Sequence, residues 1–285
     1  MIRNTNDLIK KHGIKFTKSL GQNFLIDFNV IKKIVDLGEL TKDDLVIEIG
    51  PGTGNMTIEL AKRAGQVVAV EIDKHLVPAL EENLQELDNV KILNHDILKV
   101  DINDIIKDFD FKKVKVIANL PYYITTPIIM GLLEKQTNID KMVFMIQKEV
   151  ALRLVAKEGT KDYGALTVAV NYYASARIAF VVSSNCFIPK PEVESAVITL
   201  DIDKIPKVDL VDRDIFRRTV RASFSQRRKT LLNALSSSMG FSISKDEYRR
   251  IFSNIGIKDN QRGETLTIYQ FAKLSNEICK KIEEP

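Results

Sequence analysis

One short segment, Asn119-Leu120-Pro121-Tyr122, carries groups that could take part in chemistry on a flat heterocycle. An exocyclic amine of a nucleobase is a poor nucleophile, because its lone pair is conjugated with the ring. Acceptors on its N–H groups would draw the nitrogen toward sp³ geometry and offset the positive charge that develops on it. The side-chain oxygen of Asn119 and the carbonyl of Leu120 could be these acceptors, and Tyr122 offers a ring for stacking. We therefore predict Asn119, Leu120 and Tyr122 to be catalytic; the alternative is a proline turn with an asparagine cap.

A second aromatic residue, Phe187, opens a segment that also holds Pro189 and Pro191. Two prolines keep such a segment extended and fix the direction in which Phe187 points. Our interpretation is that Phe187 and Tyr122 enclose a flipped-out adenine between them. A stiff connector with Phe187 in the core is the alternative.

Glycines alternate at positions 50, 52 and 54, between an apolar run at 45–49 and an amphipathic stretch at 56–64. The pattern predicts a buried strand, a tight turn and a helix, and such a turn forms a crevice where backbone N–H groups face a ligand. A tight turn with spare glycines is the alternative.

Two further residues indicate the ligand. Position 55 is asparagine, so the dinucleotide fingerprint lacks its third glycine. Glu71 ends the next apolar run, 71 − 50 = 21 residues after Gly50, where an acid can accept both hydroxyls of a ribose. The pattern favours a nucleoside without a pyrophosphate, and S-adenosyl-L-methionine fits best.

Polar residues end two more apolar runs. Asp96 follows the run at 90–93 and could accept from an adenine amino group, and Asn119 follows the run at 114–118. Each alone is more often a cap or turn residue. Because ligands of parallel sheets bind at the carboxyl ends of the strands, their occurrence together with Glu71 favours one shared site. Segment 19–25 mixes apolar and amide groups, and we expect it to fold back over this crevice.

Apolar runs alternate with helical patterns up to residue 200, which predicts an α/β fold with a parallel, doubly wound sheet. The expected strands lie at 45–49, 67–71, 90–93, 114–118, 142–146, 178–182 and 196–200. Residues 157–164 form a glycine-containing loop that we expect to be mobile. Beyond 200 the alternation stops, a linker follows, and the remainder is helical. We place the domain boundary between 1–203 and 204–285.

The stretch from 213 to 229 holds seven basic residues and the single acid Asp214, and apolar side chains four residues apart give it a helical stripe. Arginine outnumbers lysine there, which suits bidentate contacts to phosphate. A solvated helix face is the alternative. The candidate RNA-binding residues are Arg217, Arg221, Arg227, Arg228 and Lys229.

The composition is that of an ordinary soluble globular protein, with 45% hydrophobic and 28% charged residues in a chain of 285. Two distant cysteines argue against a disulfide framework, and three scattered histidines argue against a metal site. The chain has no apolar run near 18 residues and no signal-peptide pattern at its start, so we expect a cytoplasmic protein without a membrane partner.

Taken together, these motifs resemble the KsgA-type small-subunit (16S) rRNA adenine N6,N6-dimethyltransferases of the rRNA adenine dimethylase family. The matching segments, in the order of that family, are 20–25, 48–54, 71–73, 119–122, 147–151, 187–191 and 227–231. The resemblance implies a Rossmann-like class I methyltransferase domain with seven strands, the last antiparallel, and a small helical C-terminal domain. It also implies dimethylation of two adjacent adenines near the 3′ end of 16S rRNA, a role in small-subunit biogenesis, and a monomer.

The same resemblance implies which residues contact S-adenosyl-L-methionine. They are Asn23, Leu25, Gly50, Glu71, Asp96 and Asn119.

Three other functions remain open at this stage. Large-subunit rRNA methylases of the erythromycin-resistance type share the first domain and differ in the C-terminal region. An assembly-checkpoint factor of the small subunit would bind the same partner with catalysis secondary. An NAD-dependent dehydrogenase is weakened by Asn55 and by the lack of a hydride-transfer acid or base at a strand end.

Overall fold

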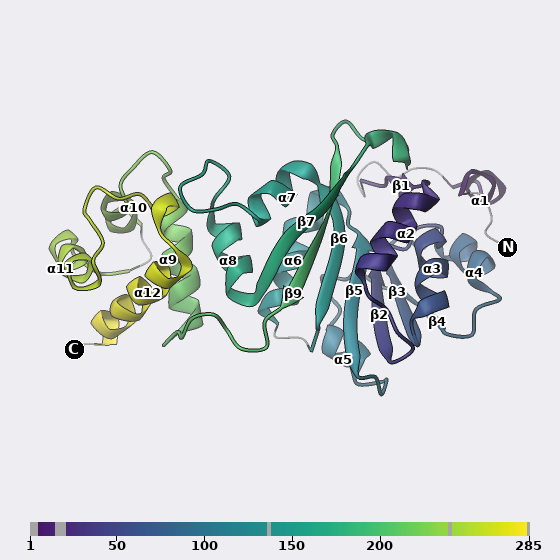
Figure 1. The fold of residues 1–285 in the computed structure, drawn as a ribbon, viewed down its shortest axis with the longest axis horizontal. Coiled ribbons are helices and arrows are strands. Elements are labelled where there is room, and N and C mark those ends of the chain that lie inside the picture. The colour runs from purple at the N-terminus through teal and green to yellow at the C-terminus, as the bar shows by residue number, and fades with distance from the viewer. Residues whose placement is uncertain (1–4, 15–20, 136–137, 239–240, 284–285) are drawn as a thin grey trace. The chain divides into compact units, whose positions relative to one another are not determined.

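The computed structural model describes residues 5–14, 21–135, 138–238 and 241–283 (Figure 1). The chain forms two compact units. The first consists of Met1–Ala151 and Ala176–Ile202, and the second of Leu152–Ser175 and Asp203–Pro285. Residues 152–175, which the sequence analysis left in the first domain, thus belong to the second unit.

A seven-stranded sheet is the centre of the first unit. Its strands are β2 (Asp44–Ile49), β3 (Gln66–Glu71), β4 (Val90–Asn94), β5 (Lys113–Asn119), β6 (Lys141–Gln147), β7 (Ala174–Val182) and β9 (Ser195–Ile202). They lie in the order β4-β3-β2-β5-β6-β9-β7, with β4 to β6 parallel and β9 antiparallel to β6. The predicted mostly parallel sheet is confirmed, although β7 begins four residues earlier than expected.

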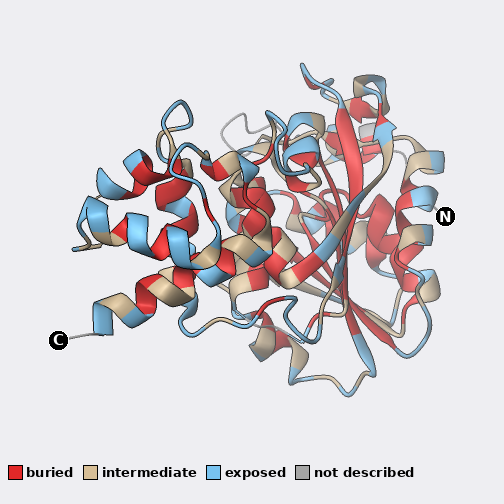
Figure 2. Cartoon of the chain, turned by 60° about the vertical axis from the view of Figure 1, so that its left-hand side comes forward, coloured by how far each residue is buried: buried red, intermediate tan, exposed pale blue. Residues whose placement is uncertain are grey.

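Helices cover this sheet, so its central strands are buried on both faces, and β2 is buried over its whole length (Figure 2). Burial on both faces explains why the strands are continuous apolar runs. On one face, Ile34 and Leu60 pack against Val46 and Ile117. The helices are α1 (Thr5–Lys11), α2 (Phe28–Leu37), α3 (Asn55–Arg63), α4 (Val77–Leu84), α5 (Ile102–Ile106), α6 (Thr125–Glu134) and α7 (Lys148–Leu154).

A second, very small sheet joins segments that lie far apart in the sequence. Strands β1 (Phe24–Leu25) and β8 (Phe187–Ile188) pair antiparallel, with Leu25 opposite Phe187. The N-terminal segment is therefore held against the segment that precedes β9, which the sequence analysis did not foresee.

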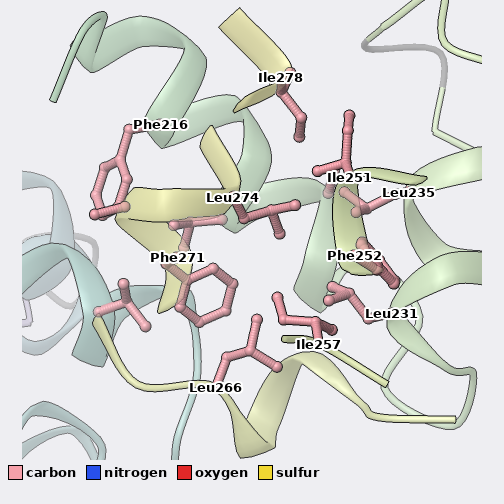
Figure 3. Close-up of a cluster of buried hydrophobic side chains, with 14 of the residues drawn as sticks. Phe216, Leu231, Leu235, Ile251, Phe252, Ile257, Leu266, Phe271, Leu274 and Ile278 are labelled. Atoms are coloured by element: carbon pink, nitrogen blue, oxygen red, sulfur yellow. The ribbon is translucent and has the colours of Figure 1, made fainter. Parts of the chain in front are cut away.

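Helices α8 (Ala165–Tyr173), α9 (Arg213–Phe224), α10 (Leu231–Ser236), α11 (Lys245–Ile255) and α12 (Ile268–Glu283) build the second unit. Figure 3 shows its core, where Phe216 of α9 lies among apolar side chains that include Phe271 and Leu274 of α12. The predicted stripe of α9 is this buried face: Phe216 and Val220 are buried, and the ring of Phe224 lies 5.8 Å from that of Phe271. In the described part of the chain, no helix is long and apolar enough to cross a membrane.

The loop at 157–164, which we expected to be mobile, makes several contacts within the second unit. The N–H of Gly159 donates to the carbonyl of Glu264 at 2.7 Å. Tyr163 is buried, and its hydroxyl donates to the carbonyl of Leu266 at 2.8 Å. The guanidinium of Arg227 donates to the carbonyls of Lys161 and Tyr163.

Candidate active site

The register of the sheet brings three predicted residues into one row. Ile49 is paired with Val70 on one side and with Ala118 on the other. The next residue of each chain segment is Gly50, Glu71 and Asn119, respectively. The strand ends therefore meet at the same edge of the sheet, as the alternation of strands and helices predicted.

The turn after β2 requires its glycines. Gly50, Gly52 and Gly54 all have positive φ, between 59° and 87°. A Cβ on Gly52 would lie 2.9 Å from the ring of Phe24, and one on Gly54 would lie 2.8 Å from Leu80. Gly54 is also the N-cap of α3 and provides no side-chain acceptor for the first turn. The N–H groups of the three glycines already donate to Val70, Glu71 and Pro51, so the groups that can bind an anion here are those in the first turn of α3.

An open cleft lies over this turn and the strand ends. Eight of the predicted site residues line it: Asn23, Leu25, Gly50, Glu71, Asp96, Asn119, Leu120 and Tyr122. Segment 21–25 forms part of the wall, as expected for a segment that folds back over the crevice. The structure thus brings together almost the whole site predicted from the sequence.

Glu71 lies buried at the end of β3, and both of its carboxylate oxygens accept backbone hydrogen bonds. The N–H of Asp73 donates at 2.8 Å and that of Gly52 at 3.2 Å. Burial raises the pKa of Glu71 to about 7, although these N–H donors pull it the other way. A carboxylate has about four acceptor positions, so these N–H donors leave room for a hydroxyl group of a ligand.

Glu48, two residues before Gly50, also lines the cleft, yet the sequence analysis gave it no role. Its side chain is fully buried, and in the described part of the chain its oxygens make no hydrogen bond of good geometry, although the hydroxyl of Thr57 lies close enough to act on it. Burial raises the pKa of Glu48 to about 8, the nearby charge of Glu71 adds to this, and the hydroxyl of Thr57 partly offsets it. With this pKa the Glu48 carboxyl is mostly protonated at neutral pH, so it lies beside the cleft as a neutral group.

Asp96 and Asn23 lie on the cleft with part of their polar groups already engaged. One carboxylate oxygen of Asp96 accepts from the N–H of Leu98 at 3.0 Å, which is the turn role named as its alternative. The other oxygen is 3.9 Å from the ammonium of Lys99. The amide of Asn23 donates to the carbonyl of Gly21 at 3.2 Å. Both side chains are half-buried and line the cleft.

The two proposed amine acceptors lie side by side at the end of β5. The Asn119 amide donates to the carbonyl of Asn23 at 2.9 Å, and its oxygen has no donor in the described part of the chain. The N–H of Leu120 donates to Met145 at 3.0 Å, which fixes the peptide. No described group donates to the Leu120 carbonyl. Both residues line the cleft and neither oxygen has a donor among the described residues, although Leu120 is only 1% exposed.

Two tyrosines follow these acceptors. Tyr122 is half-buried, and its hydroxyl shares a hydrogen bond of 2.6 Å with Ser195. Tyr123, which the sequence analysis passed over, is 50% exposed and also lines the cleft. A Cβ on Gly21 would lie 3.3 Å from the Tyr123 ring, so the N-terminal segment packs closely on it. The pair of tyrosines after Pro121 was the signal that could have identified Tyr123.

Phe187 is the predicted site residue that the structure does not bring into the cleft. It is only 3% exposed and packs in the cluster that holds Met145, Val182 and Val197. This is the core position named as the alternative. Its backbone nevertheless pairs with Leu25, so the ring lies next to the wall of the cleft.

The predicted RNA-binding residues lie on α9 and in the turn that follows it, and all five are exposed. Arg217 pairs with Asp214 at 2.7 Å, and Arg227 is engaged by the carbonyls of the 157–164 loop. Arg221, Arg228 and Lys229 have no ion-pair partner in the described part of the chain. These three are the basic groups most available to an external phosphate.

These features fit S-adenosylmethionine. Glu71 can accept from ribose hydroxyls, and N–H groups in the first turn of α3, whose N-cap Gly54 has no side-chain acceptor, can bind a carboxylate. Among the described residues, no group of three or more His, Cys, Asp or Glu side chains could hold a metal ion.

Comparison with known proteins gives the same assignment. The model of the family "Ribosomal RNA adenine dimethylase" matches residues 13–278. "Ribosomal RNA small subunit methyltransferase A" of Clostridioides difficile (strain 630) is 50% identical over 279 residues, 98% of this chain and 96% of that protein. The protein of that name from Geobacillus kaustophilus (strain HTA426) is 49% identical over 278 residues, 96% of this chain and 95% of that protein.

Two solved structures extend the comparison. A dimethyladenosine transferase from Plasmodium falciparum aligns over 90% of this chain and 97% of its own, with a TM-score of 0.77 and 24% identity. The 23S rRNA methyltransferase ErmE aligns over 90% and 99%, with a TM-score of 0.68 and 25% identity. The first likeness concerns the fold alone. From the family match and the relatives we conclude that the chain belongs to the ribosomal RNA adenine dimethylase family, and that it is a class I methyltransferase with S-adenosylmethionine as cofactor.

Proposed function

We propose that the protein dimethylates N6 of two adjacent adenines near the 3′ end of 16S rRNA, in the small ribosomal subunit or its precursor, and that it takes part in small-subunit biogenesis. The observation that carries this proposal is the pair of oxygen acceptors at Asn119 and Leu120 beside a cleft suited to the cofactor. The names of relatives that are about 50% identical over nearly the whole chain support the small-subunit substrate. We propose a cytoplasmic monomer.

In this proposal the cofactor supplies an electrophilic methyl group, and the chain positions and polarises the amine. In the first transfer the Asn119 oxygen and the Leu120 carbonyl accept from the two N6 hydrogens, and in the second transfer one of them accepts from the single N6 hydrogen that remains. This contact localises the nitrogen lone pair and offsets the charge that develops in the transition state. The base does not need to lose a proton before transfer; N6 releases one proton to solvent water after it has accepted the methyl group, so the absence of a histidine or lysine at these positions is consistent with the reaction.

The proposed cofactor contacts are Asn23, Leu25, Gly50, Glu71, Asp96 and Asn119. Glu71 would accept from the cofactor ribose, and Asp96 would accept from the adenine amino group. Because Asn119 donates to the carbonyl of Asn23, the segment around Asn23 and the proposed catalytic acceptor are held together.

We propose that the target base stacks on Tyr122. Phe187 remains the proposed second wall of the base site. Since its ring is buried, it would have to leave its cluster to face the base. The Phe187 variants described below decide between this role and a purely structural one.

The proposed rRNA contacts are Arg217, Arg221, Arg227, Arg228 and Lys229. Their exposure supports phosphate binding, as does the absence of an ion pair within 4 Å for Arg221, Arg228 and Lys229 among the described residues. The existing contacts of Arg227 to the 157–164 loop indicate that it also stabilises this part of the second unit.

A large-subunit substrate is the second candidate, because the 23S rRNA methyltransferase ErmE aligns with 90% of this chain. The test is transfer of radiolabelled methyl groups from S-adenosylmethionine to purified 30S subunits, 50S subunits and protein-free 16S and 23S rRNA. The 30S particle or its RNA should accept label, up to four methyl groups per particle, and mapped products should be dimethyladenines. Label confined to 50S subunits or 23S rRNA would overturn the proposal. Cells with an Asn119→Ala variant test the assembly role, because a pure assembly factor would restore the normal subunit profile without methylation.

A further inference from the structure

The hydroxyl of Tyr122 lies 2.6 Å from that of Ser195, a residue outside the segment that carries the proposed acceptors. Ser195 is fully buried and is the first residue of β9, 73 positions further along the chain. It does not line the cleft. The contact is therefore a link from the interior of the sheet to a ring that the cleft exposes.

Ser195 is a rigid anchor. It pairs with Gln147 in the antiparallel ladder between β6 and β9. The carbonyl of the preceding residue, Glu194, accepts from the N–H of Lys148 at 3.0 Å, and the Glu194 carboxylate pairs with the Lys148 ammonium at 2.8 Å. The ladder and these contacts fix the backbone of Ser195, so its hydroxyl can leave Tyr122 only by rotation about χ1 in a fully buried site.

The other end of Tyr122 is held as well. The hydroxyl of Thr125 donates to the Pro121 carbonyl at 3.0 Å, and the N–H of Leu120 donates to β6. With the backbone and the phenol oxygen both fixed, the ring cannot change its χ1 rotamer without loss of a hydrogen bond. The phenol oxygen lies on the rotation axis of the ring, so this bond sets where the ring lies, while packing sets the tilt of its face.

We propose that Ser195 is a positioning residue for methyl transfer: its hydrogen bond holds the Tyr122 ring in the place where the target adenine stacks. The inference rests on the proposed stacking role of Tyr122. Burial raises the pKa of Tyr122, so the phenol stays protonated at neutral pH and the bond persists. Removal of the bond should reduce kcat/KM for RNA by roughly two- to tenfold, the range for one net hydrogen bond, and leave cofactor affinity unchanged.

The experiment compares Ser195→Ala, Tyr122→Phe, the double variant and Tyr122→Ala in the full-length protein. The probe is a 16S rRNA fragment with 2-aminopurine at one of the two target positions, because stacking on an aromatic ring quenches its fluorescence. We expect Ser195→Ala and Tyr122→Phe to reduce quenching and kcat/KM to a similar extent. The double variant should lose no more than either single variant, since both remove the same bond.

A control separates this effect from a general loss of stability. Ser275 is also a buried serine, and its hydroxyl donates to a backbone carbonyl in α12, within the second unit. Ser275→Ala should leave quenching unchanged even if its melting temperature falls as far as that of Ser195→Ala. If Ser195→Ala does not fold, Tyr122→Phe tests the same bond from the other side.

Each outcome has one meaning. Parental quenching and kcat/KM in Ser195→Ala or Tyr122→Phe, with quenching lost in Tyr122→Ala, overturns the role of Ser195 and leaves the stacking role of Tyr122 intact. The role of Ser195 is also overturned if the fold-loss of kcat/KM in the double variant equals the product of the losses in the two single variants. Parental quenching in Tyr122→Ala instead refutes the proposed stacking itself.

Discussion

The side-chain amide of Asn119 donates a 2.9 Å hydrogen bond to the main-chain carbonyl of Asn23, 96 positions away in the sequence. The bond joins the end of β5 to the N-terminal segment that lines the cleft. Since the amide nitrogen is engaged, the amide plane is fixed and its oxygen faces a space with no donor among the described residues. One side chain thus closes the wall of the cleft and provides an acceptor.

Asn119→Ala should lower turnover by about 10²–10³-fold, by analogy with loss of one oxyanion-hole group, because the acceptor acts mainly on the transition state. RNA affinity should change little. Single-turnover assays and RNA binding measure the two effects separately. Asn89→Ala is the matched control, since its amide also donates to backbone carbonyls and lies outside the cleft. Equal loss of RNA affinity and turnover in Asn119→Ala would contradict a transition-state role.

Glu71→Ala should weaken S-adenosylmethionine binding by roughly 1.5–3 kcal/mol, the value for hydrogen bonds to a charged group. Because burial raises the pKa of Glu71 to about 7, parental affinity should also increase from pH 6 to pH 8, as the carboxylate that accepts from the ribose forms. Titration calorimetry at several pH values measures both. Unchanged affinity in a folded Glu71→Ala variant would eliminate the ribose contact.

Glu48 should make the unliganded protein less stable as pH rises. Its pKa is about 8 in the folded protein and near its ordinary 4.5 in the unfolded chain, so the folded state binds more protons between these values. The contribution of Glu48 to the free energy of unfolding is therefore highest below pH 4.5. It falls between pH 4.5 and pH 8, by at most about 1.4 kcal/mol per pH unit.

Glu48→Gln should flatten that decline, as chemical denaturation at each pH would reveal. Glu59→Gln is the control, because Glu59 is a buried glutamate of the same unit that is paired with Lys62. An identical pH profile for Glu48→Gln and the parent would mean that Glu48 does not stay protonated in the folded protein.

The strand-end part of the site could be predicted because local patterns determine it. Apolar runs that alternate with helical patterns determine the sheet. The sheet then places the residues that follow Ile49, Val70 and Ala118 in one row. Polar residues at those positions therefore had to meet. No detail of packing is needed for that inference.

Contacts between distant segments could not be predicted in this way. A Phe-x-Pro-x-Pro pattern fixes the local backbone, but the face on which Phe187 lies depends on its pairing with Leu25, which has no local signal. The link from Tyr122 to Ser195 crosses 73 positions for the same reason. The 157–164 loop has a flexible composition, yet Tyr163 is buried and Arg227 contacts its carbonyls, which only the packed helices determine.

Neutralisation of Arg221 and Arg228 together should flatten the salt dependence of RNA binding by about two phosphate contacts, because each contact releases counterions. Cofactor affinity should stay unchanged. The control is the double variant Arg249→Ala and Lys280→Ala, which removes the same charge from the second unit. Arg249 and Lys280 already form ion pairs of 2.6 Å, with Asp246 and Glu277 respectively. A slope equal to that of this control pair would indicate that Arg221 and Arg228 do not contact phosphate.

Phe187 can be tested by variants that separate stacking from packing. Phe187→Ala should lower stability by about 3–5 kcal/mol, as loss of a buried aromatic ring does, whatever its other role. Phe187→Leu fills most of the volume and lacks the ring, whereas Phe187→Tyr keeps the ring.

If Phe187 holds the flipped base, Phe187→Leu should fold and lose the free energy of stacking on the base, roughly 1–3 kcal/mol. Phe187→Tyr should keep much of the activity. The second methylation should suffer more than the first, because monomethyladenine must be held in one rotamer about its C6–N6 bond. Single-turnover assays that resolve the two products by mass measure this, with Phe144→Leu as a control at a fully buried position outside the cleft. Normal formation of both products by Phe187→Leu, with only a lower melting temperature, would assign Phe187 to the core and leave Tyr122 as the stacking surface for the base.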